Sequence, residues 1–101
     1  MFGLYIIRVV GNSMKPIFRD GDFAIVCKYR RPKITDVVLV RHPEHGLIIK
    51  RLIHQDQFDN AVYLAGDNTL TISSHHMGKV PSEAIIGVVY ICISKTVISR
   101  V

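Results

Sequence analysis

The chain has 101 residues and a formal net charge of +5, and hydrophobic residues make up 49% of it at a mean hydropathy of +0.27. This length allows one domain, expected to span residues 1–101, with a single hydrophobic core, and the composition excludes a disordered chain. The longest nearly uncharged stretch, residues 84–94, falls short of the roughly 20 residues that a membrane-spanning helix needs.

The short apolar segments are rich in β-branched residues and are bounded by turn residues, which predicts a mainly β fold. Strands are expected at 3–10, 22–29, 36–42, 46–54, 60–66 and 84–94. A single helical turn is expected from Met14 to Phe18, and residues 79–84 read as a turn. The last strand is apolar throughout, which indicates a strand covered on both faces or a partner interface. Residues 95–101 are expected to form a frayed or packing tail.

The first notable segment is the bend that follows the first strand. An apolar run enters Gly11, Ser13 lies on the bend, and Pro16 prevents an immediate return to strand pairing. The pair Asp20-Gly21 then turns the chain into the second strand. Ser13 is therefore expected to be displayed at the surface, where its hydroxyl can act as a nucleophile if a base lies beside it.

The second notable segment is the fourth expected strand, in which Lys50 interrupts an apolar run. Alternation along a strand places Lys50 on the same face as Ile48 and Leu52. Removing a lysine from water disfavours its charged form and lowers its pKa, which yields a neutral amine that can take a proton from a hydroxyl. Ser13 and Lys50 together are candidates for a catalytic dyad. The alternative for Lys50 is a lysine whose amine extends from a strand edge into water.

These segments belong to an ordered series of short motifs. In chain order they are Gly11-Asn12-Ser13-Met14-Lys15-Pro16, Asp20-Gly21-Asp22, Lys50-Arg51, Gly66-Asp67-Asn68, Gly78-Lys79-Val80-Pro81 and Ile86-Gly87. The series resembles that of the Ser/Lys-dyad proteases of the S24 and S26 types, which include type I signal peptidases and the self-cleaving domain of LexA-type repressors. The resemblance implies a compact domain of coiled β-sheets, with Ser13 as the nucleophile and Lys50 as its base.

The resemblance also implies roles for the residues around the dyad. Backbone N–H groups of Gly11, Asn12 and Ser13 would hold the oxyanion. Asp67 and Asn68 would support the site without taking part in the chemistry. Met14 and Phe18 would line the substrate groove, with core packing as the equal alternative for Phe18.

Residues 69–77 depart from the signal peptidase pattern. Counting back from Gly78 places Ser73 and His75 where that family has an Asp and an Arg, so its supporting ion pair is missing. Thr71 would replace the family serine that orients the lysine. The departure weakens the assignment to a true signal peptidase more than the assignment to the superfamily.

The expected partner is a protein or peptide substrate. The basic residues are scattered apart from the cluster Lys28, Arg30, Arg31 and Lys33, which reads as a solvated loop, so no nucleic acid is expected. Cys27 and Cys92 read as free thiols, and the histidines lack metal-ligand spacing, so neither a metal nor a cofactor is expected. Residues 1–10 do not read as a secretory signal, so the chain as written is expected in the cytoplasm, with association with a membrane as the alternative. The sequence does not decide whether the chain contacts a membrane surface or forms a homodimer.

Three functions fit these observations. The first is a compact protease that processes or matures another protein. The second is a self-cleaving regulator of the LexA type. One observation argues against it: only 12 residues precede Ser13, which leaves no DNA-binding domain and no upstream arm to cut. The third is a non-catalytic binding module that keeps the fold while the altered loop at 73–76 leaves the dyad inactive.

Overall fold

The computed structural model describes residues 3–68 and 79–101 of the chain. These residues form a mainly β fold, with one short 3-10 helix at Ser82–Ala84. The strands are β1 (Leu4–Arg8), β2 (Phe23–Cys27), β3 (Val37–His42), β4 (Gly46–Asp56), β5 (Ala61–Ala65), β6 (Lys79–Pro81), β7 (Ile85–Ile93) and β8 (Ile98–Arg100).

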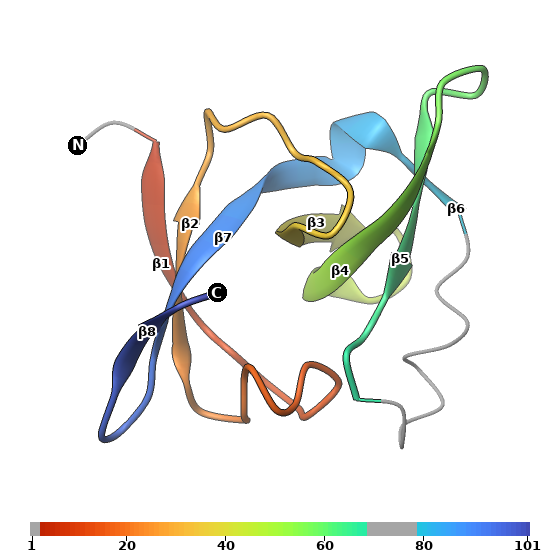
Figure 1. The fold of residues 1–101 in the computed structure, drawn as a ribbon. Helices are drawn as coiled ribbons and strands as arrows, with labels where there is room; N and C mark the ends of the chain where they lie inside the picture. The colour runs from red at the N-terminus through yellow and green to blue at the C-terminus, as the bar shows by residue number, and fades with distance from the viewer. Residues whose placement is uncertain (1–2, 69–78) are drawn as a thin grey trace.

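The strands form one antiparallel sheet in the order β1-β2-β7-β3-β4-β5-β6, and β8 pairs with β7. Register shifts interrupt the pairing at Ile25/Val26, Leu39/Val40 and Leu52/His54. Because such irregularities bend a strand and increase its twist, the sheet can curl. Figure 1 shows the result, with β1, β2, β7 and β8 together on the left and β3, β4 and β5 on the right.

The curled sheet packs two hydrophobic clusters, and β3 contributes to both. Alternate residues of β3 point to opposite faces, so Val37 and Leu39 join one cluster while Val38 and Val40 join the other. The first cluster includes Met14 and Phe18 from the bend after β1. In β7, Val88 and Val89 belong to different clusters, which confirms that this strand is covered on both faces along part of its length.

The six strands expected from the sequence are all present, with ends within two residues of those expected. The helical turn after Ser13 is also present, because the Phe18 N–H donates to the Met14 carbonyl at 3.0 Å. Two segments contain strands that the sequence did not lead us to expect. The segment read as a turn begins with β6, which pairs with β5, and the segment read as a tail contains β8, which pairs with Ile91–Ile93 of β7.

Both missed strands have three residues, too few for alternation to be recognised, and they form only because a longer strand offers them an edge. Within the described part of the chain, no helix is long and apolar enough to span a membrane.

Candidate active site

The bend that carries Ser13 is held by side chains of its own loop. Gly11 has φ of +84°, a conformation that residues with a side chain rarely adopt, and this explains the glycine at the point where the chain leaves β1. The Gly11 N–H donates to Asp20 Oδ1 at 2.7 Å, and the Asp20 N–H donates to Asn12 Oδ1 at 3.2 Å. These two bonds join the start and the end of the loop and fix the segment between them.

Lys50 lies in β4 opposite Val38 of β3, and its exposed fraction is 4%. It is the one buried charged residue in the part of the chain that the structure describes. Burial removes water from the amine and lowers the pKa of Lys50 below the ordinary lysine value. This confirms the expected desolvation and excludes a lysine that extends its amine into water.

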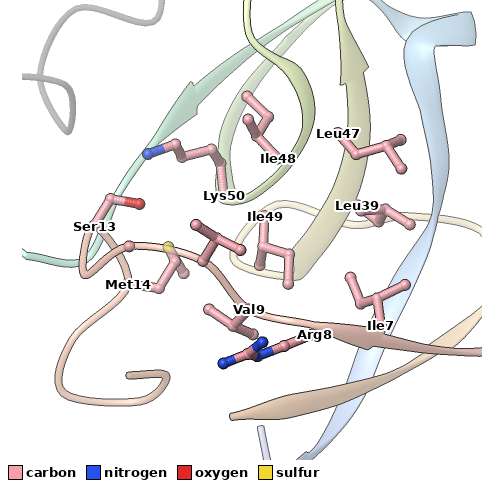
Figure 2. A pocket seen from close by; sticks show the side chains of 12 residues that line it. Ile7, Arg8, Val9, Ser13, Met14, Leu39, Leu47, Ile48, Ile49 and Lys50 are labelled. Atoms are coloured by element: carbon pink, nitrogen blue, oxygen red, sulfur yellow. The ribbon is translucent and has the colours of Figure 1, made fainter. Parts of the chain in front are cut away.

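Ser13 and Lys50 line the same pocket, which has a volume of about 160 Å³. Figure 2 shows the Ser13 hydroxyl and the Lys50 amine pointing toward one another from two segments of the chain, the bend after β1 and strand β4. The other lining residues are mostly apolar: Ile7, Arg8, Val9, Val10, Gly11, Met14, Leu39, Leu47, Ile48 and Ile49. The pocket therefore brings a hydroxyl and a desolvated amine together among mostly apolar side chains.

The loop after β5 connects the two halves of the site. The Asn68 N–H donates to the Ser13 carbonyl at 2.8 Å, and the Asn68 side-chain amide donates to the Asn12 carbonyl at 2.9 Å. The neighbouring Asp67 accepts two hydrogen bonds from Arg51, at 3.0 Å from Nε and 2.5 Å from Nη2. Because Arg51 follows Lys50 in β4, this loop ties the serine bend to the lysine strand.

Arg51 is a supporting residue that the sequence reasoning left without a role. Its guanidinium also donates to the Thr35 carbonyl at 2.7 Å, and its hydrogen bonds to Asp67 raise its pKa. The signal was available in the motif series, because Lys50-Arg51 and Gly66-Asp67-Asn68 place an arginine and an aspartate directly beside the candidate site residues. Asp20, whose carboxylate accepts from the Gly11 N–H, also lies in one of the motifs, but the sequence did not indicate this contact.

The structure changes two of the expected roles around the dyad. Phe18 is fully buried in the core and does not line the pocket, which favours core packing, the stated alternative to a place in the substrate groove. Met14 is 2% exposed and lines the pocket as part of the core beneath it. The Gly11 N–H already donates to Asp20, which removes it as an oxyanion donor and makes it a support of the bend.

The expected positions of Thr71, Ser73 and His75 lie outside the described residues. Within the described segments, 3–68 and 79–101, no group of His, Cys, Asp and Glu could hold a metal ion. The site places a hydroxyl near a desolvated amine, and such a hydroxyl can attack a carbonyl with the amine as its base.

In the part of the chain that the structure describes, the edge of β4 beside the pocket is open. β5 pairs with Arg51–Asp56 of β4, whereas Gly46–Lys50 pairs with β3 alone among the described strands. An extended peptide could therefore add to the unpaired side of this segment through main-chain hydrogen bonds.

Comparison with known protein families supports this interpretation of the fold. A family model described as Peptidase S24-like matches residues 2–90, which include the serine bend, the lysine strand and the loop that joins them. The chain belongs to the Peptidase S24-like family. A search of curated proteins found no match. Membership in the S24 family confirms the expected superfamily, and the curled, mainly β sheet is consistent with the fold of that family.

Proposed function

We propose that this S24 family member is a serine endopeptidase in which Ser13 is the nucleophile and Lys50 is its general base. The observation that supports the proposal most directly is the burial of Lys50, which lowers its pKa and favours the neutral amine, beside a pocket that Ser13 also lines. A buried lysine with no catalytic role would only destabilise the fold, because taking an ammonium ion out of water is costly.

In the proposed reaction, neutral Lys50 takes the proton of Ser13 Oγ as the oxygen attacks the scissile carbonyl. The resulting ammonium ion gives that proton to the leaving amine, which departs as the new N-terminus and leaves an acyl ester on Ser13. Lys50 then takes a proton from water, and the hydroxide formed attacks the ester and releases the new C-terminus. The lysine returns the proton to Ser13.

The developing oxyanion needs hydrogen-bond donors that are already oriented. We assign this contact to the backbone N–H groups of Ser13 and Asn12, since the Gly11 N–H donates to the Asp20 carboxylate. Each such donor contributes roughly 3 kcal/mol of transition-state stabilisation. Asn68 supports this geometry because it holds the carbonyls of Asn12 and Ser13 from the other side of the bend.

The substrate is proposed to be an extended segment of a protein that lies along Leu47–Lys50, the open edge of β4. Main-chain pairing there would supply affinity and bring a carbonyl to Ser13. A pocket of about 160 Å³ accommodates small side chains near the scissile bond, in agreement with the resemblance to signal peptidases. Processing of a leader peptide or maturation of a precursor is the biological role that fits this specificity.

The proposal is tested by incubating a library of extended peptides with the wild-type chain and with Ser13→Ala, Lys50→Ala and Lys50→Arg. Wild type should cut a subset of the peptides, and all three variants should lose cleavage by at least about 100-fold, since arginine does not deprotonate. Circular dichroism of each variant checks that the fold is kept. Lack of cleavage by folded wild type would favour the non-catalytic binding module, and undiminished cleavage by Lys50→Arg would exclude lysine as the base.

A further inference from the structure

The outer face of the layer formed by β1, β2, β7 and β8 is apolar. Residues that face one another across antiparallel strands lie on the same side of a sheet, so the strand register identifies this face. One row runs Ile6, Ile25, Ile91 and Arg100, a second runs Arg8, Phe23, Ile93 and Ile98, and Leu4 faces Cys27 beside them. We call these ten residues the outer face; none of them is acidic.

Six of the ten outer-face residues are exposed, and Ile25, Cys27, Ile91 and Ile93 are half-buried. None of its residues belongs to either hydrophobic cluster, whereas their neighbours Ala24, Val26 and Cys92 on the opposite side are buried in the first one. Ile6 is 68% exposed and Ile98 is 72% exposed, with Leu4 and Phe23 also exposed. Figure 1 shows β3, β4 and β5 on the other side of this layer. An apolar patch of this extent on a protein surface indicates an interaction site.

A basic loop borders the outer face at the end where β1 begins. The Lys28 N–H donates to the Gly3 carbonyl at 2.6 Å, and the Tyr29 ring lies so close to Gly3 that a Cβ there would come within 2.5 Å of it. These contacts fix the loop beside Leu4. Tyr29 is 72% exposed, and Arg31 and Lys33 are exposed farther along the same loop.

The charges decide which partner fits. Residues 28–36 carry four basic side chains and one acidic one, and the outer face adds Arg8 and Arg100. Two copies of the chain packed face to face would bring these positive charges together, which opposes association. An anionic lipid surface complements them, and its acyl boundary accepts exposed aliphatic side chains. Nucleic acid would complement the charge as well, but it offers no such boundary for Leu4, Ile6 and Ile98.

We propose that the outer face and the residue 28–36 loop dock the chain on the surface of an anionic lipid bilayer. The aliphatic side chains enter the headgroup boundary while Lys28, Arg31 and Lys33 contact lipid phosphates, and Tyr29 lies at the interface, a position in which tyrosine is enriched. The proposal does not depend on the dyad, and a Ser13→Ala variant should bind lipid as wild type does.

Because the chain has no tryptophan, a single introduced tryptophan reports the environment of one position. Ile6→Trp places the probe on the outer face, and Phe58→Trp places it on the β4–β5 turn, where Phe58 is fully exposed. With vesicles of 30% phosphatidylglycerol in phosphatidylcholine, Trp emission of the Ile6 variant should shift to the blue and become protected from iodide, and that of the Phe58 variant should not change. Pure phosphatidylcholine vesicles should produce a much smaller shift.

Two double variants distinguish a specific contribution of the basic loop to lipid binding from a general effect of net charge. Arg31→Gln/Lys33→Gln removes two charges from the loop, and the control Arg19→Gln/Arg41→Gln removes two exposed charges elsewhere. At about 1 kcal/mol for each basic residue near an anionic surface, the loop variant should bind the phosphatidylglycerol vesicles about 30-fold more weakly, and the control much less so. All four residues are exposed, so the melting temperatures should stay near that of wild type.

Several outcomes would overturn the proposal. They are absence of binding to the anionic vesicles, equal blue shifts at positions 6 and 58, and equal weakening by the two double variants. A blue shift of the Ile6→Trp variant that follows protein concentration without lipid would identify the outer face as an interface between copies. Tighter binding to single-stranded DNA than to vesicles, lost in the loop variant, would identify nucleic acid as the partner.

Discussion

At the level of single residues, the burial of Lys50 lowers the stability of the fold while the proposed catalysis requires it. Its amine is buried in a strand whose neighbours on the same face are apolar, and this position disfavours the ammonium ion. Between the lowered pKa in the folded chain and the ordinary value in the unfolded chain, the unfolded state binds more protons. Stability therefore rises with pH across that interval.

Lys50→Met should stabilise the fold while it abolishes catalysis. The gain should be roughly 0.5–2 kcal/mol, the range typical of single stabilising substitutions. It should be largest below the lowered pKa of Lys50, where wild type buries a charge, and should shrink as the pH rises toward 10.5, where both states lose the proton. Urea unfolding at several pH values measures this, with the exposed Lys33→Met as control. A Lys50→Met variant less stable than wild type at neutral pH would contradict the desolvation of Lys50.

At the level of elements, the loop after β5 holds the serine bend against the lysine strand through two neighbouring residues. Asp67 binds Arg51 of β4, and Asn68 binds the carbonyls of Asn12 and Ser13. The two contacts have different consequences, because one fixes the loop and the other fixes the bend.

Arg51→Ala should destabilise the fold by about 1–3 kcal/mol, since it removes charge-assisted hydrogen bonds to Asp67 and a hydrogen bond to the Thr35 carbonyl. Thermal or urea unfolding measures the loss. Arg41→Ala, an exposed arginine of the neighbouring strand β3, should change stability by less than about 0.5 kcal/mol. Equal effects of the two substitutions would show that the Arg51–Asp67 pair contributes nothing particular to the fold.

Asn68→Ala should lower kcat more than it changes KM, because it frees the Asn12 carbonyl and loosens the bend without touching the open edge of β4. A loss of about 10–100-fold in kcat is expected from a small misplacement of the nucleophile. Steady-state kinetics on a peptide found in the library measures it, and Gln57→Ala on the exposed β4–β5 turn is the control. A pure rise in KM would instead place Asn68 in substrate binding.

At the level of the whole molecule, the sequence predicted the parts of the fold that rest on local pattern. β-branched runs between turn residues located six strands, and a lysine among apolar residues located the candidate base. Tertiary contacts decided the rest. Phe18 is in the core because the bend folds back over β2 and β7, and β6 and β8 exist because longer strands offer them an edge. The Gly11–Asp20 bond joins residues 9 positions apart and the Arg51–Asp67 bond residues 16 apart, so local pattern predicts neither bond.

The central claim is that Lys50 activates Ser13 for acyl transfer. Its most direct test is to mix the chain with a nitrophenyl ester, stop the reaction in acid, digest with trypsin and locate the acyl group by mass spectrometry. The peptide of residues 9–19 contains Ser13 as its one hydroxyl side chain. We expect a hydroxylamine-labile ester on Ser13 in wild type and at least about 100-fold slower acylation in Lys50→Ala. Acylation of Ser13 at the same rate in Lys50→Ala, or none at Ser13 in wild type, would contradict the claim.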